Sequence, residues 1–187
     1  MSDVDVLESV LAKDEALLAG IRDDQWDGPT QCPDYDVRTL ANHVAGWAQV
    51  FAASANERAA DVDASTYTTD DPAGDFGTAA KDLIAGWRAG GTDREVTLMG
   101  GPQPAQMVLG MTLMEYVTHG LDLALATGQP VPFSDDELEL TLERGQATLP
   151  DEYRGAGMPF GDKVDVPAGA PAVDRLLAFM GRQPTAG

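Results

Sequence analysis

Apolar residues recur at intervals of three and four along most of this chain, and this spacing restricts the fold more than any other feature. The pattern begins with Leu7, Val10 and Leu11 and continues to about residue 22. It returns in three long segments, 37–58, 76–87 and 104–127, and in two shorter ones, 134–149 and 172–180. Little of the sequence alternates with a period of two. We therefore predict an all-α protein, a bundle of antiparallel neighbours with additional short helices.

The residues between these segments predict where the helices begin and end. Ser2 with Asp5, and Ser134 with Glu137, have the spacing of capping boxes, and Asp36 is a plausible cap for the second helix. Connections are expected at 26–33 and 61–74, which are rich in proline or polar residues. A brief extended piece at 94–99 is followed by a Gly-Gly-Pro turn. The helix at 104–127 is apolar on most faces, so we expect it to be central.

Composition limits the partners that such a bundle can have. The 12 Lys and Arg against 31 Asp and Glu give a formal charge of -19, which repels nucleic acid and anionic membrane surfaces. The length of 187 residues predicts a single domain over 1–187, with a short C-terminal extension from about residue 150. No basic leader or long apolar stretch is evident, so we expect a cytoplasmic protein. The single cysteine, Cys32, cannot form an internal disulfide and is predicted to be a buried structural residue.

Three residues inside the apolar stripes carry chemistry. The chain has two histidines, and His43 shares a helix face with Leu40 and Trp47. Glu115 and His119 lie one helical turn apart on the central helix. A buried carboxylate needs a partner, and the sequence has no lysine or arginine between 94 and 144. We therefore predict that His43, Glu115 and His119 meet and bind one divalent metal ion.

Two imidazoles and a carboxylate suit zinc, nickel, iron or manganese, and they leave a coordination position open, as catalytic sites do. Asp122, three residues after His119, has the spacing to accept the second ring proton, although a solvated helix charge is an equal alternative. Trp47 is a candidate for the pocket wall, with simple core packing as its alternative. Met107, Met111 and Met114 are interpreted as core packing.

Three motifs together resemble a known family. They are Cys32-Pro-Asp-Tyr-Asp-Val-Arg-Thr-Leu-Ala-Asn-His43, then Glu115-Tyr-Val-Thr-His119-Gly-Leu-Asp122, then Asp174-Arg-Leu-Leu-Ala-Phe-Met-Gly-Arg182. In this order they resemble the DinB-like superfamily, in the branch grouped with mycothiol-dependent maleylpyruvate isomerase. The resemblance implies a four-helix bundle whose metal is held at His43, Glu115 and His119. It also implies a thiol cofactor such as mycothiol or bacillithiol, and a homodimer.

These observations lead to three hypotheses about function. The first is a metal-dependent thiol transferase or isomerase, in which the metal activates the cofactor thiol toward a small electrophilic substrate and no protein nucleophile is needed. The second is a hydrolase that uses a metal-bound water. The third is a non-catalytic bundle in which the metal or a ligand only stabilises the fold. The resemblance implies an additional C-terminal domain in the isomerase, whereas this sequence ends soon after the helix around Leu177, so the resemblance does not extend to maleylpyruvate as the substrate.

Overall fold

The fold is described from a computed structural model that covers residues 2–32, 34–156, 160–167 and 169–185. Met1, Pro33 in the predicted connection, 157–159 and 168 in the predicted extension, and 186–187 lie outside these ranges. Among the described residues, no helix combines the length and hydrophobicity needed to cross a membrane.

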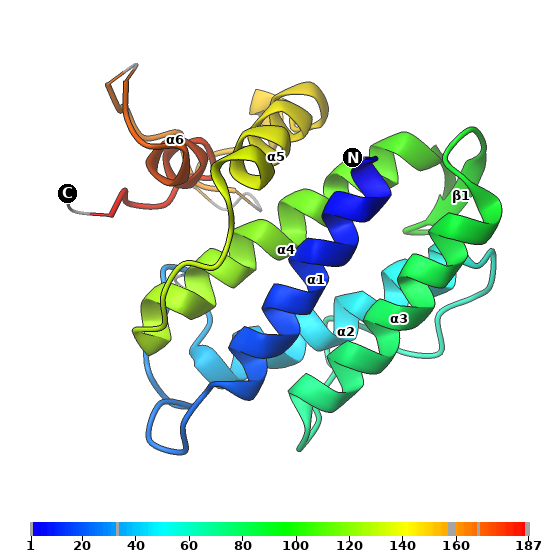
Figure 1. Cartoon of the computed structure of the whole chain (residues 1–187), viewed down its shortest axis with the longest axis horizontal. Coiled ribbons are helices and arrows are strands. Elements are labelled where there is room, and N and C mark those ends of the chain that lie inside the picture. Colours follow the sequence, from blue (N-terminus) through cyan, green and yellow to red (C-terminus); the bar gives the residue numbers. More distant parts are fainter. Residues whose placement is uncertain (1, 33, 157–159, 168, 186–187) are drawn as a thin grey trace.

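Four long helices form a bundle, and the prediction of an all-α fold is confirmed (Figure 1). The helices are α1 (Asp3–Ala19), α2 (Val37–Ala55), α3 (Pro72–Gly90) and α4 (Ala105–Thr127). Both α1 and α2 pack against α3 and against α4, so the four helices enclose one core. Two additional helices follow, α5 (Asp135–Thr148) on α4 and α6 (Ala172–Phe179) on α5, with a short 3-10 turn at Asp151–Tyr153 between them.

Helix ends largely follow the local signals in the sequence. Both predicted capping boxes are present, at Ser2 and at Ser134. The predicted loop at 61–74 is wrong at its end, because α3 begins at Pro72. The Asp71 side chain accepts a hydrogen bond from the backbone of Gly74, and a proline is tolerated in the first helical turn, where its missing N–H is not needed.

The predicted extended piece belongs to a β-hairpin. Strand β1 (Glu95–Leu98) pairs antiparallel with β2 (Gly101–Pro104), so the prediction of a Gly-Gly-Pro turn is wrong for Gly101 and Pro102. The turn itself consists of Met99 and Gly100, with φ values of 52° and 82°. Positive φ at both central residues matches the twist of a tight hairpin. The hairpin therefore places Met99 at its tip.

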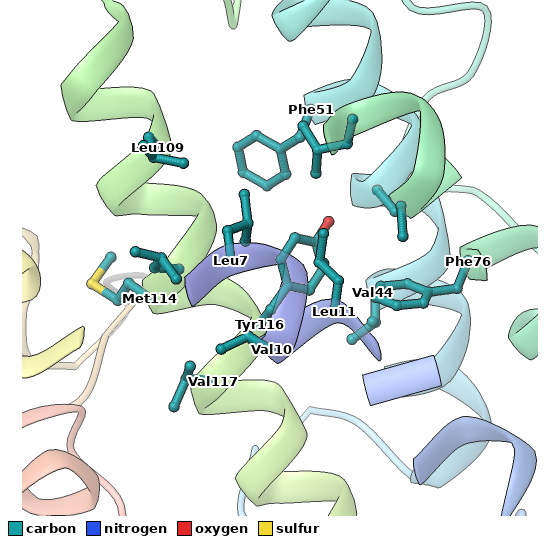
Figure 2. Close-up of a cluster of buried hydrophobic side chains, with 14 of the residues drawn as sticks. Leu7, Val10, Leu11, Val44, Phe51, Phe76, Leu109, Met114, Tyr116 and Val117 are labelled. Atoms are coloured by element: carbon teal, nitrogen blue, oxygen red, sulfur yellow. The ribbon is translucent and has the colours of Figure 1, made fainter. Parts of the chain in front are cut away.

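The core fixes how α2 and α4 face each other. Figure 2 shows residues of α1, α2, α3 and α4 converging on Tyr116, whose side chain is fully buried. Its ring packs edge-on against Phe51 of α2 and Phe76 of α3, with centroid distances of 6.0 and 5.4 Å. As predicted, α4 is central and buried on most faces. Because Tyr116 points into this core, its neighbour Glu115 lies on an adjoining face of α4.

Candidate metal centre

Helices α2 and α4 bring His43, Glu115 and His119 together. Each offers a potential ligand atom, and these atoms all lie within 4.8 Å of one another. His43 Nε2 lies 2.9 Å from Glu115 Oε1, and His119 Nε2 lies 3.5 Å from the same oxygen. The two imidazoles meet edge-on with ring centroids 5.1 Å apart. The donor atoms of three side chains thus point to one location.

The other ring nitrogen of each histidine contacts a polar side chain. Tyr35 Oη lies 3.3 Å from His43 Nδ1, and Asp122 Oδ2 lies 3.0 Å from His119 Nδ1. A partner at Nδ1 sets the orientation of an imidazole and its tautomer, and leaves Nε2 for a ligand. Asp122 is fully buried, so the alternative of a solvated helix charge is wrong. The contact from Tyr35 had not been predicted.

Arg182 completes the arrangement from the C-terminal segment. Its Nη2 donates to Asp122 Oδ2 at 2.9 Å, its Nε to Oδ1 at 3.3 Å, and its Nη1 to the carbonyl of Met180. Arg182 was not expected beside these acids, because it follows α6 and lies 60 residues after Asp122. Its place at the end of the third motif was the available signal in the sequence.

The charges around the site keep both acids ionised. Burial alone would raise the pKa of Glu115, but the adjacent His119 and His43 and the more distant Arg182 outweigh it and hold that pKa below its ordinary value. Burial acts in the same way on Asp122, where hydrogen bonds with His119 and Arg182 again leave the pKa lowered. Glu115 and Asp122 against Arg182 leave one net negative charge among these three groups. This charge suits a divalent cation.

A cavity of about 530 Å³ opens onto these residues, and we name it the site cavity. Helices α2 and α4 contribute Trp47, Met114 and the three candidate ligands. The C-terminal part of the chain contributes Phe160, Met180 and Arg182. Trp47 is half-buried, with its ring centroid 6.3 Å from that of His43. A cavity of this size accommodates a small organic molecule.

Cys32 lines the same cavity, which corrects its prediction as a buried structural residue. The loop that precedes α2 leaves its side chain only half-buried. Burial raises the pKa of the thiol more than the nearby charge of Arg182 lowers it. At neutral pH Cys32 is therefore a neutral thiol rather than a nucleophilic thiolate.

Thr118 lines the site cavity and has a buried hydroxyl. Its side chain is 2% exposed, and its oxygen has no hydrogen-bond partner among the described residues. Two other threonines of α4, Thr112 and Thr127, donate to the carbonyl four residues earlier. A buried hydroxyl without a partner is unfavourable, which sets Thr118 apart from the other two threonines.

Comparison with known proteins identifies several similar chains. Residues 8–124 match the family model of the mycothiol maleylpyruvate isomerase N-terminal domain. Two uncharacterized proteins, from two strains of Mycobacterium tuberculosis, are each 35% identical over 173 residues, covering 89% of this chain and 90% of theirs. The fold is similar to crystal structures of the mycothiol-dependent maleylpyruvate isomerase and of its histidine-to-alanine mutant. Their TM-scores are 0.60 and 0.62 at 19% identity, over 85% of this chain and 72% of theirs.

Proposed function

Because this chain belongs to the family of the mycothiol maleylpyruvate isomerase N-terminal domain, we propose that it is a metal-dependent enzyme acting with a low-molecular-weight thiol of the mycothiol type. His43, Glu115 and His119 bind one divalent ion, with zinc, nickel, manganese or iron as candidates. The thiol occupies the site cavity and is transferred to, or used to isomerise, a small electrophile. The observation that carries the proposal is the convergence of three ligand atoms within 4.8 Å on the floor of that cavity.

The donor set fits a metal of this kind. Glu115 Oε1 faces the Nε2 atoms of two different helices, an arrangement in which one cation replaces direct contacts between the side chains. The side chains of His43, His119 and Glu115 are 18%, 11% and 23% exposed, so the site is sheltered and still reachable. A cavity on one side leaves room for an external ligand, as in catalytic rather than structural sites.

The protein residues have distinct tasks in this proposal. A bound divalent ion would supply the Lewis acidity that deprotonates a coordinated thiol. Asp122, held by Arg182, accepts the Nδ1 proton of His119, and the Tyr35 oxygen accepts that of His43, so both Nε2 lone pairs face the ligand position. With a thiol bound in the cavity, Trp47 and the apolar cavity wall would limit the access of water. Cys32 remains neutral and stays outside the chemistry.

The first experiment measures metal content by mass spectrometry on protein purified without an affinity tag. The parent is expected to hold near one equivalent of a divalent metal, and His43→Ala, His119→Ala and Glu115→Gln to lose it. Asp34→Asn is the matched control, because Asp34 is a carboxylate of the same cavity outside the ligand cluster. A parent that stays metal-free after incubation with zinc, nickel or manganese would refute the site.

The second experiment tests the thiol. Cobalt(II) replaces the native metal, and mycothiol is titrated while thiolate-to-cobalt charge-transfer absorption is recorded. We expect saturable absorption with the parent and none with His119→Ala. A metal-loaded parent that shows no change with mycothiol or bacillithiol would contradict the role of the thiol. It would leave the metal centre in place.

A further inference from the structure

A second cavity adjoins the site cavity. Its volume is about 470 Å³, and it shares Trp47, Met114, Glu115 and Phe160 with the first. We name it the methionine cavity, because Met99, Met107, Met111 and Met114 line it. These are four of the seven methionines in the chain. The two cavities therefore meet beside Glu115, where the proposed metal ligands converge.

The methionine cavity is apolar. Among the described residues that line it, Glu115 is the one charged group, and no lysine or arginine is present. Met107 and Met111, for which core packing is predicted, are only partly buried and form its wall, and Met111 also packs against the core. The described walls of the cavity offer no lysine or arginine to an anionic molecule. Methionine side chains adapt to differently shaped apolar ligands.

The mouth of this cavity carries exposed apolar residues. Of the large hydrophobic side chains in the described ranges, Met99 and Tyr153 are the exposed ones, at 79% and 49%, and both line this cavity. Met99 also has a φ of 52°, a conformation that is unfavourable for most residues other than glycine. The tight hairpin requires this conformation, which holds Met99 exposed at the cavity.

We propose that the methionine cavity binds the apolar body of an uncharged electrophile, whose reactive carbon lies beside Glu115 at the junction of the two cavities. The reaction at that carbon rests on the proposed function. In the simplest case the thiol adds across an activated double bond: sulfur forms the C–S bond, the thiol proton ends on the neighbouring carbon, and no other reactant is consumed. The binding preference itself depends only on the walls of the cavity.

Binding of the uncharged dye Nile red tests the subsite without metal chemistry or turnover. Met111→Gln and Met99→Asn are expected to weaken binding by at least about fivefold each, because each removes apolar contact area. Leu125→Gln is the matched control, since Leu125 is a partly buried residue of the same helix that lines neither cavity. Met99→Asn is also expected to raise the melting temperature, since asparagine tolerates positive φ. Weaker binding by a more stable variant cannot be attributed to unfolding.

Competition tests the preference for an uncharged ligand. From the metal-free protein, decanol should displace Nile red at a concentration at least about tenfold lower than decanoate. Decanoate has the same chain, but its charge finds no lysine or arginine among the described residues of the apolar cavity. Equal displacement, or unchanged binding by both methionine variants, would overturn the inference. A third result would also overturn it: the parent binds no dye and sediments as a dimer, and Met99→Asn sediments as a monomer. The apolar mouth would then be a self-association surface.

The outcomes separate this inference from the proposed function. A parent that cannot be loaded with metal but shows the expected dye pattern would refute the function and retain the subsite. A metal-loaded, mycothiol-binding parent without that pattern would refute the subsite alone.

Discussion

The buried pair of Asp122 and Arg182 provides the sharpest quantitative prediction. The Asp122 side chain is fully buried, and that of Arg182 is 10% exposed. Removing one partner of a buried ion pair costs about 3–5 kcal/mol, because the other charge is left without compensation. Since Arg182 borders the site cavity, where water reaches it, we expect the lower end, about 3 kcal/mol, for Asp122→Asn. In a chain of this length that corresponds to a fall in melting temperature of about 6–12 °C.

A double-mutant cycle in zinc-free buffer at pH 7 distinguishes this pairing from unrelated packing effects. Asp122→Asn and Arg182→Met should each lower the free energy of unfolding. In the double variant the decrease should be smaller than the sum of the two single decreases by at least about 2 kcal/mol. The free energy of unfolding is measured by urea denaturation. The control is Asp24→Asn, since the Asp24–Arg22 pair is largely exposed and should contribute little. Losses that add within about 0.5 kcal/mol would refute the coupling.

The pH dependence of the same variant has a defined sign. Because the folded pKa of Asp122 is lowered, the folded protein releases a proton that the unfolded chain retains at mildly acidic pH. The resulting stability is present above the unfolded pKa and is lost as the pH falls through the folded one. Asp122→Asn should therefore flatten this part of the acid limb of the stability curve. An unchanged acid limb would contradict the assignment.

Three further substitutions test neighbouring features. Asp14 is 1% exposed, both of its oxygens lack a partner in the described part of the chain, and burial raises its pKa well above the ordinary value. Stability should therefore fall as the pH rises above the unfolded carboxyl pKa. Asp14→Leu, which is similar in shape, should raise the free energy of unfolding by about 1–3 kcal/mol at pH 7 and should remove its decrease with rising pH. Urea denaturation at pH 5 and pH 8 measures both effects. Tyr35→Phe should weaken zinc binding by about 10-fold through the loss of the contact to His43, measured by competition with a chelating dye. Thr118→Val should leave the melting temperature unchanged or higher and weaken mycothiol binding in the cobalt titration, whereas unaltered binding would exclude the hydroxyl as a ligand contact.

Much of the fold could be predicted because local and global preferences agree. Helical periodicity identified each long helix, and the two capping boxes located helix starts within one or two residues. The β2 strand was missed because Gly101–Pro104 has the composition of a turn. Its pairing depends on β1 folding back through Met99 and Gly100. Short strands gain their stability from such non-local partners, which local composition does not report.

The candidate ligands were predictable for a similar reason. His43, Glu115 and His119 stood out as polar residues within apolar helical stripes, and such residues need partners. Their proximity is observed, while metal binding remains a prediction. The family model ends at residue 124, yet Phe160, Met180 and Arg182 line the same cavity. No local pattern in those residues indicated that they would lie over α2 and α4.

The sequence by itself determined the helices, their buried faces and the three polar residues that those faces must accommodate, because side-chain spacing along a helix is set by 3.6 residues per turn. Only the tertiary structure decided what surrounds these residues: the Arg182–Asp122–His119 chain, the contact of Tyr35 with His43, the half-buried Cys32 and the apolar cavity beside Glu115. Arg182 and part of the apolar cavity wall come from segments distant in sequence, and their approach depends on how the α5 and α6 region packs on the bundle. The positions of Cys32 and Tyr35 depend on the path of the loop before α2. Helical periodicity carries no information about either.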